Sequence, residues 1–303
     1  MTTIKLALDW TPNINHIGFF VANELGLYRQ QGIILDLLNP RDDNYALTPG
    51  KKLELDLADF AIAPFETVIS LNNKNTIVQA IAVYAILQED LSCIVSLSSS
   101  DIQSPKHLDA TTYASYKARY EDHIVRQMVL NDGGEGTLNI VYPEKLGIWN
   151  TLLSGNANST WIFDNWEGVE AANKNIELRK FYLSDYGIPY GYSPVVLGKK
   201  ERITANQKTY SAFIQATKKG FLYAKEHPAE AVAMLQPHLT AHDAQNIDLS
   251  QSLNQTAKFF GDTTCCGTMK PERVKAFLHW LVDHNLETER ILHQDLFTNE
   301  LVR

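Results

Sequence analysis

The sequence predicts an α/β fold of two lobes, each built on a doubly wound sheet. Short apolar segments alternate with segments in which apolar residues recur at helical spacing, which is the pattern of βαβ units. This alternation occurs twice, in an earlier and a later half of the chain. The chain has 303 residues and is 45% hydrophobic, enough for one large or two ordinary domains.

The first half is expected to form a βαβαβ unit. A helix is predicted over 14–29, where Ile14, Ile17, Val21, Leu25 and Tyr28 share one helical face. A second helix is predicted after Pro64, since proline is tolerated in a first helical turn. The expected strands are 4–8, 33–38 and 59–63, followed by an apolar run over 77–86.

The second half repeats the alternation and then returns to the first. A helix is predicted over 120–131 and a short turn over 104–108, and helices dominate from residue 207. The expected strands are 93–97, 110–115, 138–142, 161–163, 177–183 and, rejoining the first lobe, 195–197. With crossovers near 85–90 and 184–192, the predicted domains are 1–87 plus 188–303 (lobe I) and 88–187 (lobe II).

Composition excludes several classes of protein. A formal net charge of −8 does not fit a nucleic-acid footprint. No run of about 18 apolar residues is present to span a membrane. The three cysteines are expected to be free thiols, because the number is odd and Cys265 and Cys266 are adjacent.

The beginning of the sequence bears on location. Residues 1–5 have no basic region leading into an apolar one, so the expected location is cytoplasmic. The alternative is a periplasmic or secreted protein whose signal peptide has been removed. The expected oligomeric state is a monomer.

One candidate binding cluster lies where the first strand ends and the first helix begins. Ligands of open α/β sheets bind at such strand ends. Trp10 offers a stacking face, Asn13 an amide and His16 an imidazole, which together suit a flat, nitrogen-rich ring. The structural alternatives are a core tryptophan, a helix N-cap and a hydrogen-bonded core histidine.

A second cluster follows strand 161–163. Asn165, Trp166 and Glu167 lie at the break before a helix, and the Glu167 carboxylate is suited to an exocyclic amine or a protonated ring nitrogen. The alternative is an exposed glutamate that only favours the helix dipole.

Further candidates carry weaker signals. The loop between a strand and a helix at 114–120 offers backbone N–H groups for an anion, and the alternative is a solvated turn. Tyr84 and Tyr190 lie near the crossovers, and Glu66 lies in a first helical turn. The candidate ligand-binding residues are Trp10, Asn13, His16, Glu66, Tyr84, Ser115, Tyr116, Arg119, Asn165, Trp166, Glu167 and Tyr190.

The stretch from Leu8 to Ala22, with its Asp-Trp-Thr-Pro-Asn-Ile-Asn-His core, resembles the opening of solute-binding proteins for thiamine pyrimidine precursors. These are type II periplasmic-binding-protein-like proteins, of the same superfamily as the fungal thiamine pyrimidine synthases. The resemblance runs from about Lys5 to the end and includes 26–32, 58–62, 166–168 and 296–300. It implies two lobes that hinge shut on a ligand in the cleft between them, with Glu167 matching the carboxylate that meets the aminopyrimidine.

The synthases of this superfamily use a lysine that holds pyridoxal phosphate and a run of cysteines for iron. This chain has no lysine in 61–67 and offers only Cys265-Cys266. We therefore expect a non-catalytic binder of a small molecule, a thiamine-related pyrimidine that is phosphorylated or not, with no cofactor, metal or catalytic residue. The alternatives are an enzyme of thiamine pyrimidine biosynthesis and the substrate-binding component of an ABC-type importer.

Overall fold

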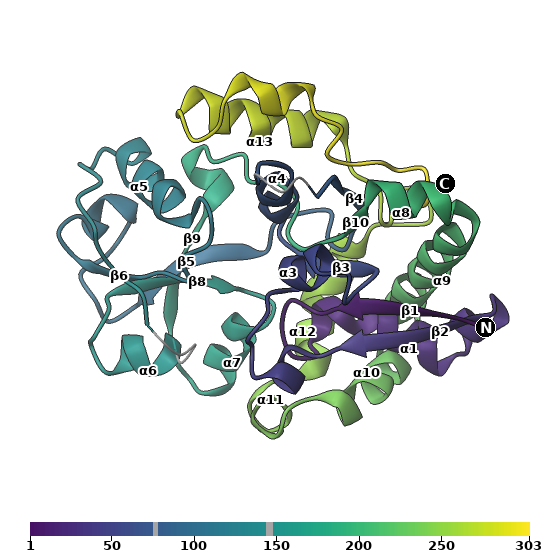
Figure 1. The fold of residues 1–303 in the computed structure, drawn as a ribbon. Helices are drawn as coiled ribbons and strands as arrows, with labels where there is room; N and C mark the ends of the chain where they lie inside the picture. The colour runs from purple at the N-terminus through teal and green to yellow at the C-terminus, as the bar shows by residue number, and fades with distance from the viewer. Residues whose placement is uncertain (75–77, 144–147) are drawn as a thin grey trace. The chain divides into compact units, whose positions relative to one another are not determined.

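A computed structural model describes residues 1–74, 78–143 and 148–303. The chain packs into two units, each with a five-stranded mixed sheet and helices (Figure 1). Unit 1 comprises Met1–Asp90, Gly191–Lys275 and Glu289–Arg303, and unit 2 comprises Leu91–Tyr190 and Ala276–Thr288. The predicted α/β fold class is confirmed. The lobe boundaries stay a prediction, because packing units do not show which segments move together.

The sheet of unit 1 has the strand order β2-β1-β3-β10-β4. β1 runs parallel to β2 and β3, whereas β10 is antiparallel to β3 and β4. Every residue of β3, β4 and β10 is buried, including those of β4 at the edge of the sheet. β10 joins the first sheet as predicted. The strands are β1 Thr2–Ala7, β2 Ile33–Leu38, β3 Phe60–Ala63, β4 Ala80–Ala85 and β10 Val195–Lys199, and residue 77 of the expected run lies outside the described residues.

The single helix predicted over 14–29 is divided into separate elements in the structure. A 3₁₀ turn, η1 (Ile14–His16), leads into α1 (Ile17–Glu24), and α2 (Leu27–Gln30) is separate. Gly26 breaks the helix with a φ of +69°, a left-handed conformation that glycine adopts without strain. The helix after Pro64 is confirmed as α4 (Glu66–Asn72).

Other helices of unit 1 pack on its sheet or on one another. The long α9 packs on α1 and α2, and α13 begins in unit 1 and ends in unit 2. These helices and 3₁₀ turns are η2 Pro40–Asp43, α3 Pro49–Glu54, α8 Lys200–Ala205, α9 Gln207–Glu226, α10 Pro228–Leu235, η5 Gln236–His238, α11 Ala241–Asn246, α12 Leu249–Thr256, η6 Ala257–Phe260, α13 Pro271–Asp283 and η7 Glu289–His293.

The sheet of unit 2 has the order β7-β6-β8-β5-β9, with β5 antiparallel to both of its neighbours. Figure 1 shows α5 on one side of this sheet and α6 and α7 on the other, the arrangement of a doubly wound fold. The elements are β5 Ser92–Leu97, η3 Pro105–Leu108, β6 Thr112–Ala114, α5 Glu121–Asn131, β7 Asn139–Val141, α6 Ile148–Leu153, β8 Ser159–Phe163, α7 Glu167–Asn173, β9 Leu178–Tyr182 and η4 Leu183–Tyr186.

Close packing of α1 against α9 holds the first strand-to-helix corner in place. A Cβ added at Gly220 would lie 2.0 Å from the carbonyl oxygen of Gly18, and one at Gly18 would lie 2.2 Å from the Phe221 ring. Only hydrogen atoms fit at these two positions. The helix that follows the first candidate cluster is therefore fixed on the core.

We expect Gly220→Ala to lower the free energy of unfolding by about 1–3 kcal/mol or more, because the new methyl group overpacks the α1–α9 contact. Urea denaturation measures the change. Lys219→Ala, at an exposed position of the same helix, is the control and should change stability by less than about 0.5 kcal/mol. Equal stability of Gly220→Ala and the wild type would contradict the packing argument.

Candidate functional site

Asn13 caps the first helical turn of unit 1. Its Oδ1 accepts the N–H of Asn15 at 2.9 Å, and its Nδ2 donates to the carbonyl of Thr11 at 3.1 Å. The residue is 7% exposed. Both ends of the amide thus bond within the chain, and Asn13 acts as the helix N-cap that was given as its structural alternative. A direct contact of Asn13 with a ligand stays a prediction.

His16 is completely buried and orients a neighbouring carboxylate. Its Nδ1 accepts the backbone N–H of Asn13 at 3.3 Å, which places the ring proton of the neutral imidazole on Nε2. Nε2 then donates to Oδ1 of Asp9 at 2.7 Å. The Asp9 side chain keeps 25% of its surface exposed, so its carboxylate is fixed by the ring and still reachable. Sequence reasoning did not select Asp9, although it stands in the same motif as His16.

Trp10 follows Asp9 directly and is partly buried. Its ring centroid lies 5.6 Å from that of Tyr45, with the two planes tilted by 48°. Tyr45 is 49% exposed and was also missed from the sequence. We call Asp9, Trp10, His16 and Tyr45 the unit 1 cluster. It joins an oriented carboxylate to two aromatic rings.

Glu66 and Tyr84, the other candidates of unit 1, are buried. Glu66 begins α4, as expected, and is 6% exposed. Tyr84 has no exposed surface; its hydroxyl lies 3.2 Å from Sγ of Cys266, and its ring stacks on Phe221. Burial raises the pKa of this phenol well above its usual range. Tyr84 is therefore a core residue, and we leave it out of the proposed site.

In unit 2, the loop after β6 folds around a buried carboxylate. Oε1 of Glu121 accepts the hydroxyl of Tyr113 at 2.7 Å and the N–H of Tyr116 at 3.1 Å, and Oε2 accepts the N–H of Ala118 at 3.2 Å. The hydroxyl of Ser115 accepts the N–H of Lys117 at 2.9 Å. The three amides expected to receive an anion are thus bonded within the loop. The anion role expected of these amides and of Ser115 stays a prediction that this geometry does not favour, and the ligand contact of Tyr116 also stays a prediction.

Arg119 of the same loop is paired as well. Its Nε donates to Oε1 of Glu287 at 3.1 Å and to the hydroxyl of Tyr120 at 2.8 Å, and Tyr120 donates to the same carboxylate at 2.6 Å. The guanidinium charge is therefore balanced inside unit 2. A ligand anion would compete with Glu287 for it.

The loop after β6 and the turn after β8 emerge at the same edge of the sheet, because these two strands are parallel neighbours. Oε2 of Glu167, the first residue of α7, accepts the N–H of Phe163 at 3.0 Å. Tyr116 is 41% exposed, and its phenol lies close enough to Glu167 and Glu121 to interact with the negative charges of both. We call Tyr116, Glu121 and Glu167 the unit 2 cluster, which is acidic.

The other candidates of unit 2 support this cluster or pack nearby. Trp166 precedes α7 at its N-cap position and is 5% exposed, and Asn165 is 2% exposed. The Tyr190 ring packs edge-on against Trp161 at 5.5 Å and Phe277 at 5.4 Å. These three side chains are placed mainly by packing, and their contact with a ligand stays a prediction.

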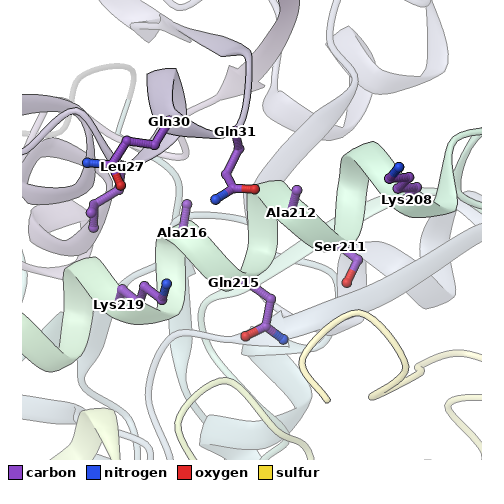
Figure 2. A pocket seen from close by; sticks show the side chains of 9 residues that line it. All are labelled: Leu27, Gln30, Gln31, Lys208, Ser211, Ala212, Gln215, Ala216 and Lys219. Carbon is purple, nitrogen blue, oxygen red and sulfur yellow. The ribbon is translucent and has the colours of Figure 1, made fainter.

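A small pocket of about 280 Å³ lies elsewhere in unit 1, between α2 and α9 (Figure 2). Figure 2 shows Gln30 and Gln31 on one side and the α9 residues on the other. Aromatic and acidic side chains are missing from its lining, so it does not suit an aminopyrimidine. The lining residues are Leu27, Gln30, Gln31, Lys208, Ser211, Ala212, Gln215, Ala216 and Lys219.

The part of the chain that the structure describes contains no group of three or more His, Cys, Asp or Glu side chains able to hold a metal ion. None of its helices is long and apolar enough to cross a membrane. The three cysteines are free, as expected.

A comparison with protein families gives a match over most of both units. The NMT1/THI5-like family matches residues 13–231. The chain belongs to this family. The matched region includes His16 and Tyr45 of the unit 1 cluster and the whole unit 2 cluster, whereas Asp9 and Trp10 precede it.

Two relatives span most of the chain. A formylaminopyrimidine-binding protein of Halalkalibacterium halodurans is 23% identical and covers 99% of this chain and 90% of its own length. A 4-amino-5-hydroxymethyl-2-methylpyrimidine phosphate synthase of Legionella pneumophila is 22% identical and covers 86% of this chain and 80% of its own length. A ligand-binding component of an ABC-type import system from Staphylococcus aureus shares the fold, with a TM-score of 0.70 at 15% identity over 99% of this chain and 98% of that one.

We expect stability to depend on pH through Glu121. Burial, and then the nearby charge of Asp122, outweigh its hydrogen bonds and raise its pKa in the folded state. A raised folded pKa means that stability is present below the unfolded pKa and is lost as pH rises through the folded pKa. Glu121→Gln removes this loss, so the stability of the variant relative to wild type should increase between pH 4 and pH 7.

Urea denaturation at several pH values measures this difference. Glu177→Gln, at an exposed position of unit 2, controls for the loss of one negative charge. A relative stability of Glu121→Gln that is constant or falls with pH would contradict the assignment.

Proposed function

We propose that this protein binds an unphosphorylated aminopyrimidine of the thiamine-precursor class, with Asp9 and Trp10 as the candidate contacts in unit 1 and Glu167 as a separate candidate in unit 2. The observation that carries the proposal is the Asp9–His16 pair, with Trp10 next to Asp9 in the chain. An aminopyrimidine presents a flat face and an exocyclic amine. The indole can stack on the face, and the fixed carboxylate can accept from the amine.

The unit 2 cluster supports an amine donor rather than a phosphate. Glu121 and Glu167 place two carboxylates near Tyr116, and the charge of Arg119 is balanced by Glu287. The loop amides that would cradle a phosphate are bonded to Glu121 and Ser115. Repulsion between carboxylates and a phosphate opposes binding of an ester. The relative from Halalkalibacterium halodurans, named for binding formylaminopyrimidine, supports the same class of ligand.

A pyrimidine-synthesising enzyme is the second candidate, because the Legionella pneumophila relative is named as a synthase. A Schiff base with pyridoxal phosphate needs a lysine amine, and 61–67 holds none. Incubation with pyridoxal phosphate, followed by an absorbance spectrum, separates the two functions. A binder leaves the spectrum of the free aldehyde unchanged.

Location and assembly remain predictions. The cytoplasmic location expected from residues 1–5 has an alternative, a receptor outside the cytoplasm, which the Staphylococcus aureus import component favours. Fractionation of the source cells with an antibody to this protein decides between them. Size-exclusion chromatography with light scattering tests the expected monomer.

We expect Trp10→Ala and Glu167→Ala each to weaken binding of formylaminopyrimidine more than tenfold in titration calorimetry. The first loses a stacking face and the second a carboxylate acceptor. Glu177→Ala, which removes an exposed carboxylate of unit 2, is the control and should bind like the wild type. Wild-type affinity in both cluster variants would rule out the proposed site.

Asp9→Asn tests the charge of the unit 1 carboxylate alone. The amide oxygen of Asn can still accept from Nε2 of His16, so the thermal midpoint should change little. Affinity for formylaminopyrimidine should fall about tenfold, because a charge-assisted hydrogen bond becomes a neutral one. An unchanged dissociation constant would show that Asp9 does not meet the ligand.

A further inference from the structure

We infer that Tyr45 is a second stacking residue, and that the ligand ring binds between the side chains of Trp10 and Tyr45. This inference rests on the proposed function and adds a residue to it. Tyr45 is a large aromatic side chain with 49% of its surface exposed, and its ring contacts that of Trp10 at a centroid distance of 5.6 Å.

The backbone at Tyr45 is unusual. Tyr45 has a φ of +60° and the preceding Asn44 a φ of +53°, so two consecutive residues other than glycine are left-handed. Asn tolerates this conformation, whereas a bulky residue such as Tyr seldom adopts it. Strain of this kind persists where the surroundings enforce it, and it clusters at ligand-binding sites.

The surroundings of Tyr45 do enforce it. Its N–H donates to the carbonyl of Pro40 at 2.8 Å, and the next N–H donates to the carbonyl of Asp43 at 3.1 Å. The side chain of Asp43 pairs with Lys52 at 3.0 Å, and the Lys52 side chain is only 8% exposed. The loop is thus tied to α3, and the Tyr45 ring is held against Trp10.

Burial does not account for a tyrosine at this position. Glycine would adopt the same backbone without strain, and half of the tyrosine surface remains in water. The exposed half of the side chain is open to a contact made from the solvent side. An aromatic face next to that of Trp10 suits one side of a flat ring.

Binding requires the two rings to separate. A ring stacked on both faces needs about 7 Å between its neighbours, twice the contact distance of about 3.5 Å between carbon atoms. The observed 5.6 Å is shorter, so Tyr45 must turn outward about its side-chain torsions when the ligand enters. Its exposed position leaves room for that rotation.

Three substitutions separate stacking from backbone structure, with formylaminopyrimidine as the probe in calorimetry. Tyr45→Phe keeps the ring and should bind within about twofold of wild type. Tyr45→Ala should lose more than tenfold in affinity. Tyr45→Gly removes both the ring and the strain, so it should match the affinity of Tyr45→Ala while its thermal midpoint exceeds that of Tyr45→Ala. Leu55→Ala, which removes another exposed apolar side chain of unit 1, is the control.

The outcomes distinguish this inference from the proposed function. Wild-type affinity in Tyr45→Ala, with loss of binding in Trp10→Ala, overturns the role of Tyr45 and leaves the proposed function standing. Recovery of affinity in Tyr45→Gly would also overturn it, since the side chain would then act only on the backbone. A wild-type protein that does not bind the pyrimidine overturns both.

Discussion

The hydrogen bond from His16 to Asp9 is the interaction on which the unit 1 cluster depends. The ring has no exposed surface, and its Nδ1 is fixed by the N–H of Asn13. Packing of α1 on α9 holds the helix that follows, where Gly18 and Gly220 allow close approach. A carboxylate at the surface thereby acquires one orientation from the core beneath it. Preorganisation of this kind reduces the entropy lost when a ligand binds.

Each unit holds a carboxylate in a fixed orientation, but the two units do so by different means. In unit 1 a buried imidazole orients Asp9, whereas in unit 2 backbone N–H groups and the hydroxyl of Tyr113 satisfy Glu121. Glu121 occupies the donors that a phosphate would use, and it adds negative charge beside Glu167. The loop after β6 is therefore built around an internal acid, which makes it a poor receptor for an external anion.

Regular elements were the most predictable part of the structure. Apolar runs gave the strands, including the return of β10 to the first sheet, because buried strands need continuous apolar sequence. The short, lysine-containing α3 had no apolar periodicity to reveal it, and Gly26 ended a helix that the periodicity alone extended. Tyr45 was missed because its partner, Trp10, lies far from it in the sequence. Asp9 and Glu121 bond to residues of their own loops, whose folded path the sequence pattern does not show. Tyr84 was selected from its position near a crossover, which says nothing about its burial.

The same hydrogen bonds bear on whether the unit 1 cluster can do acid–base chemistry. A general base needs a lone pair within reach of the proton that it removes. Nδ1 of His16 uses its lone pair on the N–H of Asn13, and Nε2 uses its proton on Asp9. Proton transfer at the ring would break one of these bonds in a fully buried setting, where an unpaired polar group is costly. The Asp9 carboxylate and the aromatic faces are then the groups of this cluster that we propose for contact with a ligand.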